Sequence, residues 1–200
     1  TFRAENSNTR RHLTEFWMVE PEVAYMDLEG DMELAEGLVQ AIVRRVLEKC
    51  SSQLKILERD TKPLEAVING AFPRISYTEA VEIIREAGVD FNWGDDFGGT
   101  DETIVGSKFN QPVIVYGYPK EIKPFYMKTD SENPKIVRNM DILAPEGYGE
   151  IIGGGQREED YQTLVNAIQE QGLKPENYKW YTDLRKYGSV PHAGFGLGVE

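Results

Sequence analysis

Cysteine is nearly absent from this sequence of 200 residues, and its scarcity excludes several classes of protein. The single cysteine, Cys50, cannot form a disulfide within the chain and leaves no thiolate cluster that would hold a metal. The sequence also lacks any apolar run approaching the roughly 20 residues that span a bilayer. No secretory signal is recognisable, and the chain begins at Thr1 without a Met, which suggests that its natural N-terminus is missing. We therefore expect a cytoplasmic protein with no membrane partner.

Positive charge is also scarce, because 22 Lys and Arg stand against 34 Asp and Glu, a net charge of −12. This balance argues against non-specific binding to nucleic acid, which depends on neutralising phosphates. It still allows a tRNA to be met through a local basic patch or a separate domain. The hydrophobic content of 40% and the charged content of 28% are ordinary for a globular protein, and the length suits one substantial domain.

Residues 1–22 predict an antiparallel hairpin of two short strands. Arg3 and Glu5 are two apart on the first strand, so they project from the same face. A guanidinium there can grip phosphate, and a carboxylate can accept from an amine. Phe16, on the second strand, offers a flat ring for stacking. The loop between the strands adds the cationic side chains of Arg10, Arg11 and His12. This set can bind a nucleoside triphosphate, although a hairpin with a solvated charged face would have the same composition.

The residue pattern of 1–22 resembles motif 2 of the class II aminoacyl-tRNA synthetases. It is similar to that of the asparaginyl members of the aspartyl, asparaginyl and lysyl subgroup in three places: Phe-Arg-Ala-Glu at 2–5, Thr-x-Arg-His-Leu at 9–13 and Glu-Phe-Trp at 15–17. The resemblance continues along nearly the whole chain. It implies an α+β fold, in which an antiparallel sheet is flanked by helices. It also implies activation of asparagine by ATP to asparaginyl-adenylate, followed by transfer to tRNA(Asn).

The resemblance also assigns roles within the hairpin. Arg3, as the catalytic residue, would bridge the α-phosphate of ATP and the carboxylate of the amino acid. Glu5 would accept a hydrogen bond from the adenine amino group, and Phe16 would stack on the adenine ring. Arg11 and His12 would reach the outer phosphates. These assignments together predict an ATP site built largely from residues 3–16.

Two carboxylates further along the chain form a candidate metal site. Asp141 lies on a predicted strand over residues 136–143, and Glu150 begins a second strand over 150–155, after a turn. Carboxylates on adjacent strands can converge on magnesium, which takes oxygen ligands and shares them with phosphates. Spacing alone does not separate this arrangement from two independent polar residues. The matching carboxylates of the family hold the metal ion on ATP, so the resemblance implies Mg²⁺ here.

Residues 153–157, three glycines followed by Gln and Arg, match neither a Walker P-loop nor a Rossmann fingerprint. The glycines let the backbone approach a ligand closely. The resemblance implies that Arg157 contacts the side-chain end of the substrate amino acid and that Glu20 lines the same pocket. A carboxylate at 20 would accept from the amide of asparagine and repel aspartate. The resemblance also puts Lys123 beside this pocket, whereas physical chemistry alone favours a surface charge.

Residues 189–200 resemble motif 3 of the same family. Gly194, Gly196 and Gly198 are expected to keep a strand thin where the adenosine of ATP lies on it. The sequence stops at Glu200, one residue before the arginine that the family carries there. Motif 1 and the anticodon-binding domain are also missing. We therefore expect residues 1–200 to be an incomplete class II catalytic domain that forms a homodimer when complete.

Apolar periodicity and capping residues predict the remaining elements. A long helix is expected to follow an Asp31 cap, run to about Cys50 and bury Leu34, Leu38, Ile42 and Val46. Further helices are expected over 79–87 after a Thr78 cap, over 102–109 after a Thr100 cap, over 158–171, and over 175–187 with Trp180, Leu184 and Tyr187 packed. Further strands are expected over 112–116 and 125–128.

Two alternatives stay open beside asparagine–tRNA ligation. The first is an asparagine synthetase paralogue of the same lineage, which would join aspartate and ammonia with ATP and would also lack an anticodon-binding domain. The second is a non-catalytic paralogue that binds nucleotide or a partner as a regulatory module. Loss of the motif 3 arginine would favour this second alternative.

Overall fold

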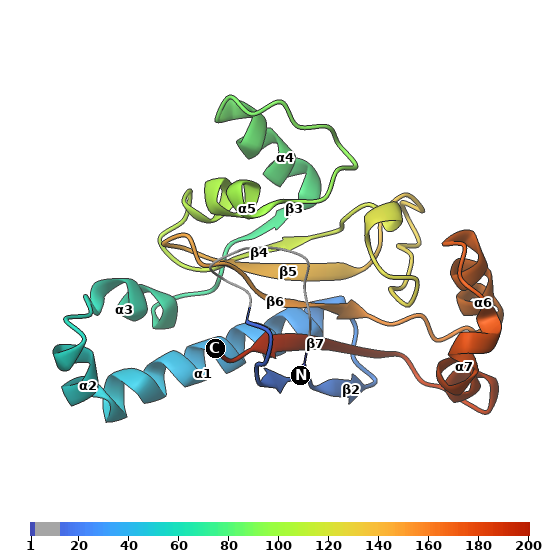
Figure 1. Ribbon diagram of the computed structural model, residues 1–200, viewed down its shortest axis with the longest axis horizontal. Coiled ribbons are helices and arrows are strands. Elements are labelled where there is room, and N and C mark those ends of the chain that lie inside the picture. The colour runs from blue at the N-terminus through green and yellow to red at the C-terminus, as the bar shows by residue number, and fades with distance from the viewer. Residues whose placement is uncertain (3–12) are drawn as a thin grey trace.

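A twisted sheet at the centre of the molecule carries the other elements (Figure 1). The computed structural model describes residues 1–2 and 13–200. The strands are β1 (Met18–Val19), β2 (Glu22–Ala24), β3 (Arg74–Ser76), β4 (Val113–Tyr116), β5 (Asn139–Ala144), β6 (Gly149–Gln156) and β7 (His192–Gly198). Their order is β1-β7-β6-β5-β4-β3, and β2 also pairs with β7. All pairs are antiparallel except β3 with β4. The predicted antiparallel sheet flanked by helices is confirmed.

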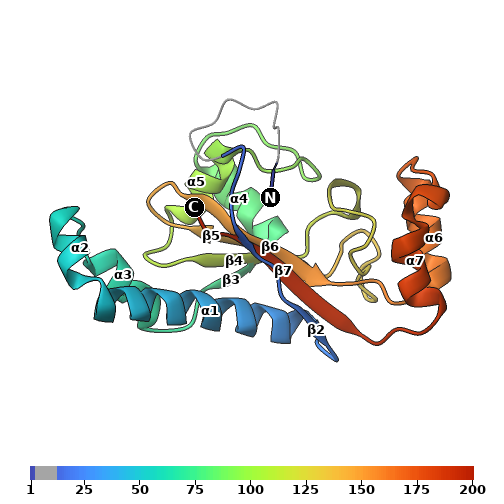
Figure 2. The same ribbon diagram turned by 60° about the horizontal axis from the view of Figure 1, so that its bottom comes forward.

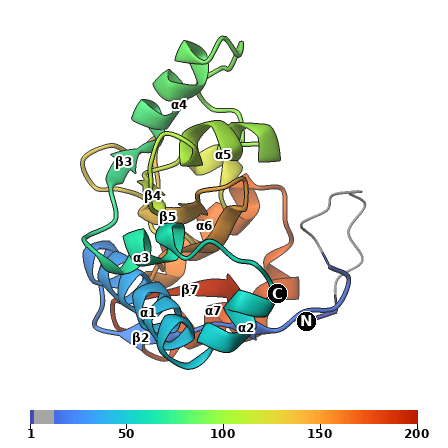
Figure 3. The same cartoon turned by 90° about the vertical axis from the view of Figure 1, so that its left-hand side faces the viewer.

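Helices cover the sheet on both faces. They are α1 (Leu28–Lys49), α2 (Ser51–Ile56), α3 (Lys62–Ile68), α4 (Tyr77–Glu86), α5 (Gly99–Gly106), α6 (Tyr161–Glu170) and α7 (Lys179–Lys186), with 3-10 turns at Lys120–Ile122 and Pro175–Tyr178. Figure 2 shows α1 along one face, with α4 and α5 on the other. Figure 3 shows α2 and α3 beside α1, and α6 and α7 stand beyond one end of β6 and β7 in Figure 1. Within the described residues, none of the helices combines the length and apolarity that crossing a membrane requires.

Two hydrophobic clusters fill these layers. The cluster on the α1 side joins that helix and α3 to alternate residues of the central strands, among them Ile142, Ile152 and Phe195. The other cluster packs α4 and α5 on β3 and β4, around Tyr77 and Tyr118. Side chains alternate between faces along a strand. The face of β5, β6 and β7 that points away from α1 is therefore free to carry polar side chains.

Helix α1 begins one turn earlier than the sequence predicts. Asp27, in extended conformation, caps it by accepting from the backbone nitrogen of Gly30 at 2.9 Å, so the predicted Asp31 cap is wrong. The predicted stripe is also wrong, because Leu34 and Ile42 are exposed. A repeat of four drifts by about 40° per step around a helix of 3.6 residues per turn. The residues buried against the sheet follow mixed spacings of four and three, which stay on one face, and are Leu28, Met32, Ala35 and Val39.

The caps of two shorter helices also differ from the predicted ones. Ser76 rather than Thr78 caps α4, since Ser76 Oγ accepts from the backbone nitrogen of Glu79 at 3.2 Å while the Glu79 carboxylate accepts from Ser76 at 2.7 Å. Helix α5 begins at Gly99 after a Gly98 cap, so Thr100 lies inside it. In both cases the carboxylate three residues after the cap fixes the start of the helix, which a search for Thr alone overlooks.

Two predicted elements near the C-terminal half are altered. The helix expected over 175–187 is divided into a 3-10 turn and α7, and Trp180, Leu184 and Tyr187 are exposed rather than packed. A 3-10 turn advances by three residues per turn, which changes the face that the following helix presents. The strand expected over 125–128 is absent, and only an isolated bridge pairs Met127 with Arg157. There, the aromatic rings of Phe125 and Tyr126 pack edge to face against α7 and the turn before it.

The strand predictions over 112–116, 136–143 and 150–155 are confirmed as β4, β5 and β6 within three residues at each end. The two ends of the described chain also lie close together. Phe2 forms an antiparallel bridge with Glu15, and the backbone nitrogen of Trp17 donates to Glu200 Oε2 at 2.8 Å. The described part of the predicted hairpin therefore lies beside the end of β7.

Gly154 tests how closely β6 and β7 pack. A Cβ atom on Gly154 would lie 2.5 Å from Cβ of Phe195 and 2.7 Å from the carbonyl oxygen of Gly194. We expect Gly154→Ala to lower the free energy of unfolding by about 1–3 kcal/mol, because a methyl group must be forced into a filled space. Gly37→Ala, in α1 with open space around it, should raise it by about 0.5–1 kcal/mol. Urea unfolding measures both, and equal effects of the two substitutions would contradict the close packing.

Candidate active site

The candidate site lies over the glycines of β7. Alternation puts Gly194, Gly196 and Gly198 on one face of the strand, while Ala193 and Phe195 point into the core. A Cβ on Gly194 would lie 2.3 Å from the carbonyl oxygen of Pro21, and a Cβ on Gly196 would lie 2.9 Å from Met18 Cε. These two glycines thus let residues 18–22, which pair with β7 at the edge of the sheet, approach it closely. Gly198 has open space above it, and contact between these glycines and adenosine stays a prediction.

Asp141 and Glu150 converge on one point of this face, as the sequence predicts for a metal site. Asp141 pairs with Gly153 across β5 and β6. A Cβ on Gly153 would lie 2.6 Å from Glu150 Oε1 and 3.4 Å from Asp141 Oδ1. The two carboxylates therefore lean over the same glycine, and a side chain at 153 would displace the Glu150 carboxylate.

Lys123 is the cationic partner of this acidic pair. Its Nζ donates to Asp141 Oδ2 at 2.6 Å and lies 4.0 Å from the centre of the Tyr118 ring. The Lys123 side chain is only 14% exposed, so it is not a surface charge. Burial alone would lower the pKa of Lys123, but the charge and hydrogen bond of Asp141 outweigh it and raise that pKa.

The carboxyl group of Glu150 holds its proton more tightly than an ordinary glutamate does. Although the residue keeps a solvent-exposed side, the negative charge of Asp141, followed by the protein atoms around the carboxyl, raises its pKa from 4.5 to about 8. Lys123 opposes this effect. The pair therefore carries an excess of acidic groups over cations, an arrangement that an added cation would stabilise.

The carboxylates of Asp141 and Glu150 suit magnesium better than a metal ion whose ligands all come from the protein. Within residues 1–2 and 13–200, no group of three or more His, Cys, Asp or Glu side chains is placed to hold a metal. Magnesium is usually bound through one or two carboxylates, with the remaining ligands coming from water and substrate phosphates. Two convergent carboxylates, of which Glu150 is exposed to solvent, match that pattern.

Arg157, at the end of β6, forms an ion pair that the sequence analysis missed. Its Nη2 donates to Glu22 Oε1 at 2.6 Å and its Nε to the same oxygen at 3.0 Å. The guanidinium carbon lies 5.4 Å from the centre of the Tyr126 ring, and the Arg157 side chain is 11% exposed. Burial lowers the pKa of Arg157, but the Glu22 bond outweighs it, so the side chain stays cationic. No local signal was available for this pair, because Glu22 and Arg157 are 135 residues apart in the chain.

Glu20 does not contact Arg157 but lies on the same face. Its Oε1 is 3.9 Å from the position that a Cβ on Gly196 would take, two residues along β7 from the glycine beneath Glu22. Glu20 is exposed, so its carboxylate is available to a ligand. The structure thus brings Glu20, Glu22 and Arg157 to one side of β7.

The predicted ATP residues are only partly within the described structure. Phe16 is half-buried, and its backbone nitrogen donates to the carbonyl of Thr1 at 3.1 Å. Five further candidates lie outside the described residues, and their roles stay predictions: Arg3, Glu5, Arg10, Arg11 and His12.

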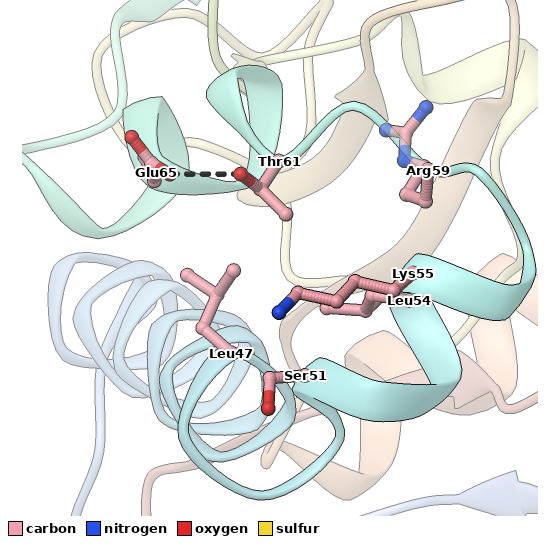
Figure 4. A pocket seen from close by; sticks show the side chains of 7 residues that line it. All are labelled: Leu47, Ser51, Leu54, Lys55, Arg59, Thr61 and Glu65. Atoms are coloured by element: carbon pink, nitrogen blue, oxygen red, sulfur yellow. Dashed lines mark hydrogen bonds between the residues drawn. The ribbon is translucent and has the colours of Figure 1, made fainter.

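A cavity of about 790 Å³ is lined by Lys123 and Met127, among others. Lys123 also contacts Asp141, and Met127 also contacts Arg157, so the cavity adjoins both candidate site residues. A second cavity, of about 290 Å³, lies between α1, α2 and α3 and is lined by Leu47 of α1, Leu54 of α2 and Arg59 of the loop before α3, among others (Figure 4). None of the candidate site residues lines this second cavity, so the first is the one associated with the site.

Comparison with known proteins gives one consistent family. The family model described as tRNA synthetases class II (D, K and N) matches residues 1–200. The asparagine–tRNA ligases of Sorangium cellulosum and Thermococcus kodakarensis are 56% and 55% identical, with 100% of this chain covering 47% and 46% of theirs. The chain therefore spans about half the length of the curated relatives it matches.

Solved structures agree with this comparison. The asparaginyl-tRNA synthetase of Pyrococcus horikoshii, complexed with asparaginyl-adenylate, has a TM-score of 0.96 at 53% identity, covering 100% of this chain and 46% of that one. The aspartyl enzyme of Entamoeba histolytica has a TM-score of 0.85 at 30% identity, covering 98% and 41%. The likeness to the asparaginyl enzyme is therefore the stronger of the two.

Glu150→Gln tests the acidic pair. The folded-state pKa is raised, so ionisation of Glu150 costs stability progressively as pH rises from about 4.5 through about 8. The variant should therefore melt at the same temperature as the parent at pH 4 and at a higher temperature at pH 9, without divalent metal. Glu82→Gln, exposed on α4, serves as the control. A shift of equal size at both pH values would contradict the repulsion.

Proposed function

The chain belongs to the class II tRNA synthetases of the D, K and N group, and we propose that it is the catalytic core of an asparagine–tRNA ligase. The observation that carries this proposal is the similarity along the whole chain to asparagine–tRNA ligases, at 53–56% identity. Its substrates would be ATP, asparagine and tRNA(Asn). By the same family argument, the complete protein would be a cytoplasmic homodimer.

The reaction needs no covalent nucleophile from the protein. The carboxylate of asparagine attacks the α-phosphorus of ATP, forming the mixed anhydride asparaginyl-adenylate, while the bond to the β-phosphate breaks and pyrophosphate leaves. A ribose hydroxyl at the end of the tRNA then attacks the activated carbonyl, and AMP leaves. Such a reaction depends on positioning the substrates and stabilising charge. The role of the site is therefore to hold two anionic groups together.

Cationic and aromatic side chains would hold the nucleotide. In this proposal Arg3 bridges the α-phosphate and the amino-acid carboxylate, Glu5 accepts from the adenine amino group, and Phe16 stacks on the ring. Arg11 and His12 contact the outer phosphates, and Gly194, Gly196 and Gly198 line the adenosine. These roles rest on resemblance to the family.

Asp141 and Glu150 would hold Mg²⁺, because their carboxylates converge over Gly153. When bound, the ion would offset the negative charge of the ATP phosphates. Lys123 supplies a positive charge against Asp141 and keeps that carboxylate oriented at 2.6 Å. Its ammonium therefore limits repulsion within the pair before ligands bind.

Glu20 and Arg157 would select the side chain of asparagine. Glu22 holds the Arg157 guanidinium by two hydrogen bonds to one oxygen, which fixes its direction. Glu20 would accept from the amide nitrogen of asparagine, while an aspartate carboxylate would meet like charge. The pocket would thus distinguish the two amino acids by charge, since their shapes are nearly equal.

Asparagine-dependent exchange of pyrophosphate into ATP, measured in the intact protein with magnesium, tests this proposal. We expect exchange with asparagine and much less with aspartate, and a larger rise in melting temperature with a non-hydrolysable asparaginyl-adenylate analogue than with the aspartyl one. A preference for aspartate would favour the asparagine synthetase paralogue. Binding of nucleotide without any exchange would favour the non-catalytic one.

Glu20→Gln tests the selectivity. The variant should lose roughly 10- to 100-fold in kcat/KM for asparagine and gain activity with aspartate, because a charged acceptor is replaced by a neutral amide with one acceptor oxygen and the repelling charge is removed. Exchange assays with both amino acids measure the change. Glu132→Gln, exposed in the loop before β5, is the matched control and should behave as the parent does. Equal losses with both amino acids would contradict a role in selection.

A further inference from the structure

The ammonium group of Lys123 already lies against the acidic pair that is proposed to hold a metal ion. Its Nζ donates to Asp141 Oδ2 at 2.6 Å, and both side chains are largely buried. The other oxygen of Asp141 faces Glu150, because a Cβ on Gly153 would lie 3.4 Å from Asp141 Oδ1 and 2.6 Å from Glu150 Oε1. A metal ion held between the two carboxylates would therefore share Asp141 with an ammonium.

The backbone that carries Lys123 is held in place by the last turn of α6. Gln171 donates from Nε2 to the carbonyl oxygen of Lys123 at 2.9 Å. Three residues before Lys123, the ammonium of Lys120 pairs with Glu170 Oε2 at 2.7 Å. The Lys123 ammonium itself lies 4.0 Å from the centre of the Tyr118 ring. The fold therefore directs this lysine at the acidic pair.

The charges around the pair determine how a second cation would be received. A further carboxylate is close, since the backbone nitrogen of Glu150 donates to Glu102 Oε2 at 3.1 Å. The pair therefore still attracts cations. An ammonium a few ångströms away opposes a divalent ion strongly, even at an effective dielectric constant of about 20. The phosphates of ATP would offset this repulsion with their own negative charge.

We propose that Lys123 is a resident counter-ion that weakens binding of a divalent metal to Asp141 and Glu150 in the absence of nucleotide, so that metal and ATP bind together. This inference rests on the proposed function, and within it on the metal role of the two carboxylates. Without ATP, Lys123 compensates Asp141 and repels a second cation. With ATP, the added phosphate charge allows the ammonium and the metal to be held side by side. The coupling is reciprocal, so ATP binding gains from the metal by the same factor.

Binding of Mn²⁺ to the intact protein without nucleotide tests this role, with the electron paramagnetic resonance signal of free Mn²⁺ as the readout. Mn²⁺ takes the same oxygen ligands as Mg²⁺. Lys123→Gln keeps a hydrogen-bond donor beside Asp141 and removes the charge. We expect this variant to bind Mn²⁺ roughly tenfold or more tightly than the parent, because the repulsion between two close cations is removed.

A non-hydrolysable ATP analogue gives the second measurement. It should tighten Mn²⁺ binding in the parent, and by a smaller factor in Lys123→Gln, after correction for Mn²⁺ bound to the analogue without protein. Melting curves show whether the variant folds. Added Mn²⁺ should raise its melting temperature more than that of the parent, since a ligand that binds more tightly stabilises the folded state more.

Two controls separate the charge of Lys123 from other effects. Lys123→Arg keeps the positive charge and should bind Mn²⁺ as weakly as the parent does. Lys135→Gln removes an exposed lysine from the loop before β5 and should also behave as the parent does. Tightening of the same size in either control as in Lys123→Gln would overturn the proposal, because the effect would then not depend on a positive charge at position 123.

The remaining outcomes are equally decisive. Unchanged Mn²⁺ binding in Lys123→Gln would overturn the counter-ion role, and weaker binding would do so by showing that Lys123 orients Asp141 for the metal. The role also falls if the analogue fails to tighten Mn²⁺ binding in the parent. Absence of Mn²⁺ binding even with the analogue would remove the metal role of Asp141 and Glu150, and that of Lys123 with it. The ligase assignment is judged separately, by exchange with asparagine in the parent.

Discussion

The close pairing of β6 with β7 is the constraint on which the candidate site depends. Gly153 and Gly154 on β6 and Gly194 on β7 have no side chains, so neighbouring groups can approach the backbone of these strands closely. Because of this, Pro21 and Glu22 pass within contact distance of Gly194, and Glu150 leans over Gly153 beside Asp141. The polar face of the sheet is therefore assembled by the absence of Cβ atoms as much as by the presence of charged groups.

The charged side chains on this face form two groups. One has more carboxylates than cations, and in the other an arginine is paired with a carboxylate. Asp141 and Glu150 share one cation, Lys123, and so favour a further cation. Arg157 is bonded to the Glu22 carboxylate, which compensates its charge. In the proposed function, the first group would hold the cation that accompanies the ATP phosphates, and the second would discriminate against an anionic side chain.

Apolar runs predicted the strands over 112–116, 136–143 and 150–155, whereas the fold class was implied by the family resemblance. Spacing alone left Asp141 and Glu150 as two independent polar residues, and the resemblance implied that they meet. Sequence patterns failed where a partner is distant in the chain. Glu22 and Arg157 are 135 residues apart, and nothing local to either indicates the pair. The burial of Asp31 was missed for a different reason, since an Asp near a helix start is typical of a cap and the actual cap, Asp27, lies four residues earlier. The apolar stripe of α1 was misplaced because an even spacing of four does not follow the helix.

The position of β7 has a consequence for how the molecule is made. This last strand lies between β6 and the first strands, and Trp17 bonds to Glu200, 183 residues further along the chain. A ribosome adding about 5–20 residues per second needs on the order of 10–40 s to cover that separation. During this interval β1 and β2 lack β7, the strand with which they pair in the described structure, and contacts so distant in sequence also close slowly. This part of the sheet can therefore form only after residues 192–198 have been synthesised.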